Sequence, residues 1–201
     1  MIGRRALWIL AGLLVAGGTL AQSAGSPVRL RGTIDDVSGD TIRLTLHDGT
    51  TASARLSPNV RIVWLTEAQL SDIKLGSYVG TAAVPLADGR LKALEMQVFP
   101  ESMRGVGEGT RDWDLGPGSS MTNGTVGSLV ADEGRTITIA YKGGEKKVLV
   151  PDDVPVVTYE PADRTAFAAG AHVLVNGVRT ADGSIVASSV SVGKDGLVPP
   201  M

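Results

Sequence analysis

The chain of 201 residues contains no cysteine and only two histidines. Without cysteine it can form no disulfide, no thiolate metal site and no cysteine nucleophile. In an oxidising compartment its fold must therefore rest on an apolar core alone. Basic residues are not in excess either, because 19 Lys and Arg stand against 21 Asp and Glu. This balance argues against nucleic acid as a partner, since nucleic-acid binding needs a basic surface.

The one long apolar run lies at the N-terminus. Arg4 and Arg5 precede an apolar segment over residues 6–20, and Thr19 and Ala21 are small residues where a signal peptidase reads. We therefore expect residues 1–21 to be a secretory signal peptide cleaved near Ala21, which would place the mature protein in the periplasm. The alternative is an uncleaved membrane anchor. No later run has the length of a membrane-spanning helix, so no span is expected after cleavage.

The remaining sequence repeats itself with an offset in the low nineties. The matched segments follow one another in the same order in both copies: 32–37 with 124–129, 41–46 with 136–141, 56–63 with 150–157, and 75–76 with 169–170. The Asp-Gly pairs at 88–89 and 182–183 continue the series. This pattern indicates a tandem duplication.

Within each copy, apolar residues mostly alternate with polar ones, which is typical of strands with one buried and one solvated face. Met96 is expected to face the core, while Glu95 and Gln97 are expected to face solvent. In the second copy Ser189 and Ser191 take the solvent-facing places. Asp-Gly and Gly-Gly pairs between the alternating segments predict tight turns.

One segment in each copy interrupts the alternation. Thr66 and Gln69 have the spacing of a capping box, which predicts a short helix that ends at Gly76. In the second copy Pro161 is expected at the first helical position, and Gly170 closes the helix. Three strands, a short helix and two strands thus occur twice, which is the element order of the OB-fold.

We therefore predict an all-β fold, β-rich with one short helix per repeat, made of tandem duplicated OB-like five-stranded barrels. The alternative is a pair of open β-meanders, each with a helix. The predicted segments are barrel domain 1 over 28–99, an ordered interdomain loop over 100–122, barrel domain 2 over 123–193 and a C-terminal tail over 194–201. The loop is expected to be at least partly ordered because its Trp, Leu and Met residues favour burial.

The most specific motif of the chain lies in this loop and just after it. It reads Met103-Arg104-Gly105-Val106-Gly107-Glu108-Gly109, then Trp113-Asp114-Leu115, then Met121-Thr122-Asn123. Together with the repeat, the motif resembles a group of uncharacterised bacterial exported proteins with tandem OB-like domains, often labelled metal ABC transporter permeases. The resemblance covers nearly all of the mature chain and implies an envelope protein, without implying a reaction.

Two features of the sequence bear on that label. A permease needs spanning segments, and none is predicted after residue 21. In the motif of the group a His stands where this chain has Thr110. The first feature argues against a permease, and the second argues against a metal role for the loop.

Metal-ligating residues are few in this sequence. His47 and His172 occupy positions that are not equivalent in the two copies, and both are expected at half-exposed strand ends. Glu108, Asp112 and Asp114 carry oxygens that a hard cation such as calcium prefers. The Asp-Trp-Asp segment lacks the spacing of a calcium loop, however, so we predict no metal site and no cofactor.

Catalytic patterns are also weak. No Gly-x-Ser-x-Gly elbow is present. Paired carboxylates occur at Asp35-Asp36 and Asp152-Asp153, but both pairs fall at strand ends or turns, where Asp favours bonds to the local backbone. We therefore predict no catalytic residues and no enzymatic activity.

Trp113 is the best candidate for contact with a ligand or partner, together with Arg111, Asp112 and Asp114. The alternative for Trp113 is that it holds the loop against a barrel. We expect a non-enzymatic binding or assembly module of the cell envelope that contacts an envelope protein or a small ligand. The alternatives are a periplasmic accessory metal-handling protein and, less favoured, a carboxylate-dependent hydrolase.

Overall fold

The computed structural model describes residues 25–130 and 135–200. The predicted signal peptide therefore lies outside the described residues. Within these two ranges the chain is built of β-strands and single 3-10 turns. The same ranges contain no helix with the length and apolar character needed to cross a membrane.

The strands follow one another along the chain with short connections. They are β1 (Ser26–Ser38), β2 (Thr41–Leu46), β3 (Thr51–Glu67), β4 (Tyr78–Pro85), β5 (Leu91–Val98), β6 (Gly109–Asp112), β7 (Ser120–Val130), β8 (Thr136–Tyr141), β9 (Gly144–Leu149), β10 (Val156–Pro161), β11 (His172–Arg179) and β12 (Ile185–Gly193). The 3-10 turns are η1 (Leu70–Asp72), η2 (Glu101–Met103), η3 (Arg164–Ala166) and η4 (Lys194–Gly196).

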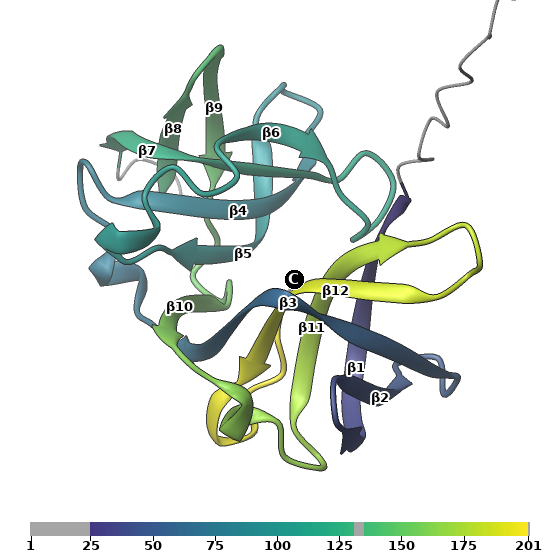
Figure 1. Cartoon of the computed structure of the whole chain (residues 1–201). Helices are drawn as coiled ribbons and strands as arrows, with labels where there is room; N and C mark the ends of the chain where they lie inside the picture. Colours follow the sequence, from purple (N-terminus) through teal and green to yellow (C-terminus); the bar gives the residue numbers. More distant parts are fainter. Residues whose placement is uncertain (1–24, 131–134, 201) are drawn as a thin grey trace, which may run out of the picture.

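A closed five-stranded barrel, here called barrel A, consists of β1, β2, β3, β12 and β11 (Figure 1). β1 pairs antiparallel with both β2 and β11, and β11 pairs antiparallel with β12. The parallel pairing of β12 with β3 closes the barrel. The predicted all-β class with a five-stranded barrel is therefore confirmed.

A second ring of five strands, here called barrel B, consists of β7, β8, β9, β5 and β4. A short parallel pairing between β5 and β9 completes it. Both rings have the same strand order and a matching register, since Thr33 lies opposite His172 in barrel A and Thr125 lies opposite Tyr78 in barrel B. That the two halves arose by duplication stays a prediction from the sequence.

The strand partners differ from those that the boundaries 28–99 and 123–193 imply. Barrel A takes β1, β2 and β3 from the N-terminal half of the sequence and β11 and β12 from the C-terminal half. Barrel B takes β4 and β5 from the N-terminal half and β7, β8 and β9 from the C-terminal half. The physical reason lies in β3, which does not turn back at the end of the barrel. Its later part continues into pairing with β10, so the next strand, β4, begins in barrel B.

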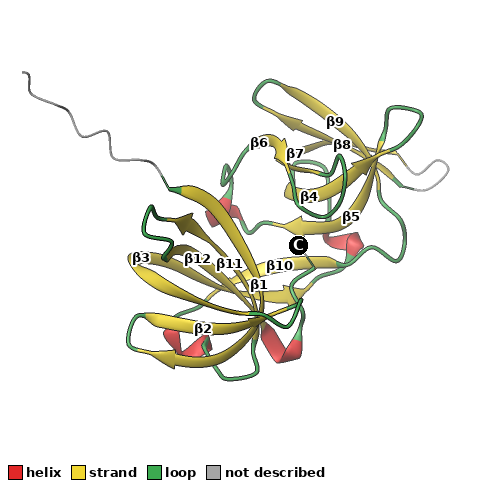
Figure 2. Cartoon of the chain, turned by 90° about the vertical axis from the view of Figure 1, so that its right-hand side faces the viewer, coloured by secondary structure: helices red, strands yellow, loops and turns green. Residues whose placement is uncertain are grey.

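Each apolar core is consequently shared between the two halves of the sequence. In barrel A, Ile42 and Leu44 of β2 pack in one cluster with Val175 of β11 and Val190 of β12. In barrel B, Met96 packs with Ile139 and other side chains of the second half. β10 joins the two rings because it pairs antiparallel with β3 and parallel with β5 (Figure 2).

The predicted helices are shorter than expected. β3 extends through Thr66, whose backbone pairs with Thr158 of β10, so Thr66 cannot cap a helix. The capping box is formed instead by Gln69 and Asp72, where the Gln69 N–H donates to the Asp72 carboxylate at 2.9 Å, and it opens only the single turn η1.

The second predicted helix is corrected in the same way. Pro161 is the last residue of β10, and Asp163 caps the turn η3 by accepting from the Thr165 N–H at 2.8 Å. Gly76 and Gly170 do adopt left-handed backbone angles, with φ of 82° and 85°. In both copies, strand pairing and tertiary packing override the local helix signal.

Engineered disulfides test the exchange of strands, because the chain has no cysteine of its own. The pair Thr33→Cys and His172→Cys should form an intramolecular disulfide on oxidation, since Cα atoms opposite each other in antiparallel strands lie about 4.5–5.5 Å apart. The control pair Thr33→Cys and Tyr78→Cys should stay reduced. Thiol titration and non-reducing electrophoresis measure both, and cross-linking of the control pair alone would contradict the exchange.

Candidate functional site

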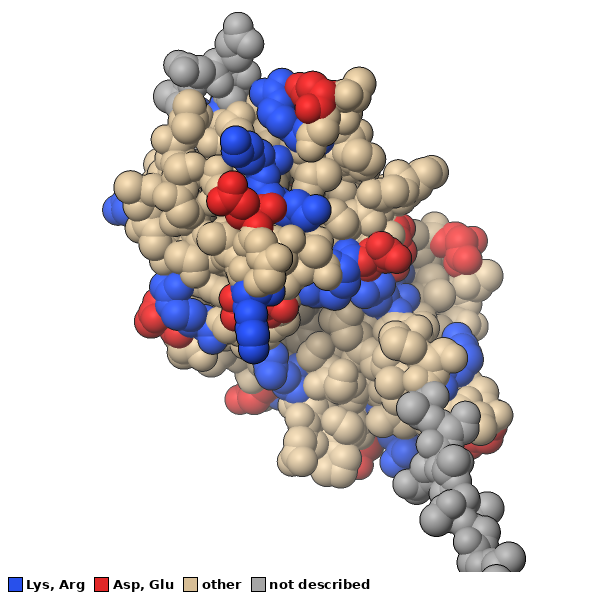
Figure 3. Space-filling view, turned by 90° about the horizontal axis from the view of Figure 1, so that it is seen from above, with Lys and Arg blue, Asp and Glu red and all other residues tan. Residues whose placement is uncertain are grey.

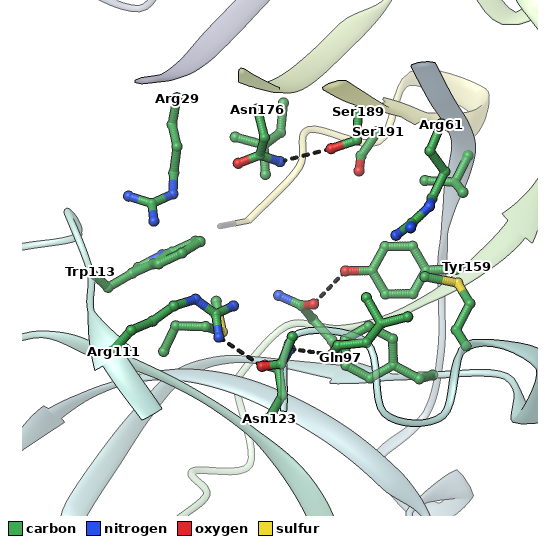
Figure 4. A pocket seen from close by; sticks show the side chains of 17 residues that line it. Arg29, Arg61, Gln97, Arg111, Trp113, Asn123, Tyr159, Asn176, Ser189 and Ser191 are labelled. Atoms are coloured by element: carbon green, nitrogen blue, oxygen red, sulfur yellow. Dashed lines mark hydrogen bonds between the residues drawn. The ribbon is translucent and has the colours of Figure 1, made fainter. Parts of the chain in front are cut away.

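A cavity of about 220 Å³ lies where the two barrels face each other. We call it the cleft (Figure 4). One wall comes from β1, β3, β11 and β12 of barrel A, and the other from β5, β6, β7 and the loop before β6. Tyr159 also lines the cleft, and its strand β10 pairs with β3 of barrel A and with β5 of barrel B.

The polar face of β5 is buried rather than solvated, which corrects the sequence prediction. Glu95 and Gln97 are 0% and 3% exposed, and Ser191 of β12 is also buried. Alternation shows only which side chains point into their own barrel. The outer faces of β5 and β12 are covered by the neighbouring barrel and by β10, so their polar residues line or underlie the cleft.

Trp113 stands at one end of the cleft between two guanidinium groups. The Cζ atom of Arg29, on β1, lies 3.7 Å from the centre of the Trp113 ring, and that of Arg111, on β6, lies 5.5 Å from it. A short turn fixes Trp113, because its N–H donates to the Ser119 carbonyl and the Ser119 hydroxyl donates back to its carbonyl, both at 2.9 Å. The indole Nε1 is buried and has no hydrogen-bond partner among the described residues.

Asp114 ties this turn to barrel A. Its carboxylate accepts from both terminal nitrogens of Arg31, at 2.7 and 3.0 Å, and lies 3.8 Å from Arg29. The hydrogen bonds from Arg31 lower the pKa of Asp114. Asp112 is exposed at the end of β6 and does not line the cleft. The structure thus brings Trp113 and Arg111 into the cleft and gives Asp114 a supporting contact.

The loop before β6 is held against barrel B by hydrogen bonds. The Val106 carbonyl accepts from the Tyr78 hydroxyl at 3.2 Å and from the Asn123 amide at 3.1 Å. Arg104 donates to the Gly76 carbonyl, and Glu108 accepts from the Lys142 N–H. The motif of the sequence therefore builds one edge of the cleft.

The cleft concentrates positive charge. Its lining contains Arg29, Arg61 and Arg111 and no carboxylate. Desolvation, and then the nearby charge of Arg29, lower the pKa of Arg111, although its side chain keeps contact with solvent. On the face that Figure 3 shows, by contrast, basic and acidic side chains lie beside one another. The excess of arginine is thus a feature of the cleft and does not extend over that face of the protein.

A chain of hydrogen bonds runs from the cleft into barrel B. The Tyr159 hydroxyl donates to the Gln97 amide oxygen, and the Gln97 amide nitrogen donates to Glu95 at 3.1 Å. Burial raises the pKa of Glu95 to about 7, against the opposing effect of hydrogen bonds from the Ala82 N–H and Gln97. Burial also raises the pKa of Tyr159, and the charge of Glu95 adds to that shift.

The remaining candidates from the sequence do not converge. His47 is exposed in the turn after β2, while His172 begins β11 and lies 3.2 Å from the Thr33 hydroxyl. Asp35 accepts from the Thr45 hydroxyl, and Asp152 pairs with Arg135 at 3.1 Å. No group of three or more His, Cys, Asp or Glu side chains with metal-binding geometry occurs within 25–130 and 135–200.

Comparison with protein-family models, with curated proteins and with solved structures found no significant match.

The positions of Arg29 and Arg61 in the cleft could not be predicted from the sequence, because an arginine on the outer face of a strand is typical of a solvated position. One signal was present. On β11 and β12 the outward positions that line the cleft carry uncharged residues, among them Asn176, Ser189 and Ser191, instead of the usual Lys and Glu.

The buried carboxyl of Glu95 gives the stability of the protein a distinctive pH dependence. The folded chain holds this proton more tightly than the unfolded chain, so the free energy of unfolding should fall as the pH rises from about 4.5 to about 7 and then level off. The total loss is of the order of 3 kcal/mol. Glu95→Gln mimics the neutral side chain, so it should be more stable than the wild type at about pH 8 and similar at about pH 5.

Urea unfolding across this pH range measures the effect. Glu145→Gln, at an exposed position of β9, is the matched control and should keep the wild-type pH dependence. An unchanged pH dependence in Glu95→Gln would show that Glu95 ionises normally.

Proposed function

We propose that this protein is a non-enzymatic binding module of the cell envelope that takes a small anionic ligand in the cleft between its barrels. The observation that carries the proposal is the presence of three arginines and no carboxylate in the lining of one cavity. Guanidinium groups present paired N–H donors that match the oxygens of carboxylates and phosphates. Asp114 lies 3.8 Å from Arg29, so an anion would supply the negative charge that Arg61 and Arg111 lack among the described residues.

The size and position of the cleft support a small ligand. A volume of about 220 Å³ is below the usual range for sites that bind drug-sized ligands. Ligand sites commonly occur between domains, where two rigid walls contribute a few convergent polar groups to a largely apolar cavity. Here Phe99, Met121 and Leu174 supply apolar surface beside the arginines.

The location of the protein is part of the same proposal. The apolar segment over residues 6–20 and the small residues before position 22 support secretion. The chain as a whole has a formal net charge of −2, so attraction of an anion depends on the local field of the cleft rather than on total charge.

A thermal-shift titration with inorganic phosphate, sulfate and succinate tests the proposal. Each anion is used at low millimolar concentration, where general stabilisation by salts is small. At least one anion should raise the melting temperature in a saturable way, because a ligand that binds only the folded state stabilises it. Arg111→Gln should weaken the binding of that anion about tenfold, since the substitution removes a charged hydrogen-bond donor from the cleft.

Arg43→Gln is the matched control. Arg43 is exposed on β2 and does not line the cleft, so its loss removes the same charge without changing the site. This variant should bind like the wild type. The proposal is wrong if none of the three anions binds saturably, or if the two variants lose equal affinity.

A further inference from the structure

Arg61 places an uncompensated charge on the barrel A wall of the cleft. It lies on β3 opposite Ser189 of β12. Its guanidinium has no hydrogen bond or ion pair with any described residue. In Figure 4 it lies beside Tyr159, on the side of the cleft away from Trp113.

Arg111 places a second uncompensated charge on the barrel B wall. Its guanidinium donates to the Gly107 carbonyl at 2.9 Å, which is a neutral acceptor. Arg29 is in a different situation, because it stacks on Trp113 and lies 3.8 Å from Asp114. The positive charge of Arg29 also repels that of Arg111, so a bound anion near Arg111 would relieve this repulsion.

The lining between these two charges is neutral. Gln97, Asn176 and Ser189 provide polar groups, and Met121 and Leu174 provide apolar surface. An anion with only one acid group would neutralise the arginine of one wall and would leave the guanidinium of the opposite wall without an ionic partner. An anion with an acid group at each end would neutralise both and would hold the two barrels together.

We infer that the ligand carries two separated oxyanion groups, carboxylates or phosphates, one bound by Arg61 of barrel A and the other by Arg111 of barrel B. This inference rests on the proposed function and specifies its ligand class. Because the cleft is small, the two groups are joined by a short connecting chain rather than by an extended molecule.

Isothermal titration calorimetry with succinate, glutarate and adipate tests this inference, with acetate as the single-acid probe and inorganic phosphate as the compact dianion. The best dicarboxylate should bind at least about tenfold more tightly than acetate and than phosphate, because it forms charge-assisted hydrogen bonds at both walls. Arg61→Gln and Arg111→Gln should each abolish this advantage, whereas Arg43→Gln should retain it. Both cleft residues are exposed, and circular dichroism checks that the variants are folded.

The outcomes separate the inference from the proposed function. If acetate or phosphate binds as tightly as the best dicarboxylate, or if either cleft variant keeps the preference for dicarboxylates, the two-group inference is wrong while anion binding in the cleft stands. If none of the five probes binds the wild type, both are wrong.

Discussion

The parallel pairing of β3 with β12 determines how the two barrels share their strands. It joins Ile62 and Leu65 of the N-terminal half to Val190 and Gly193 near the C-terminus, and it closes barrel A. Because β3 continues past this barrel, the chain has to build β4 and β5 into barrel B before it can return through β10. Neither barrel can therefore be completed by one half of the sequence. Their stabilities are coupled through the backbone, in addition to any contact between their surfaces.

The same exchange creates the cleft. β3 and β10 pass between the rings, and this crossing brings the outer faces of β5 and β12 against a second layer of protein. Polar side chains that would otherwise meet solvent, such as Gln97 and Ser191, are buried as a result. The loop before β6 adds Trp113, which lies between guanidinium groups from β1 and β6. Positive charge thus gathers at a place to which strands from both halves of the chain contribute.

The sequence predicts the fold class and the inward-facing residues well, because alternation reports directly on which side chains enter a barrel. Ile42 and Leu44 are buried as their pattern indicates. The sequence could not reveal the exchange of strands between the barrels. Met96 and Val190 occupy equivalent positions in the two repeats, so either residue could lie opposite Ile62. The capping box at Thr66 failed because pairing with β10 outweighs a local helix signal. Among the residues of the cleft, Trp113 and Arg111 were predictable because they lie in an unusual loop. The presence of Arg29 and Arg61 in the cleft depends on how the two barrels pack against each other, which the sequence pattern does not show.

Cross-strand nuclear Overhauser effects between backbone protons in solution distinguish the exchange of strands from two barrels that each close within one half of the chain. Contacts are expected between Ile62 and its partner Val190, which the parallel pairing places side by side. Contacts between Ile62 and Met96 in their place would mean that each half of the chain closes its own barrel. The cleft as described, with walls drawn from both halves, would then not exist.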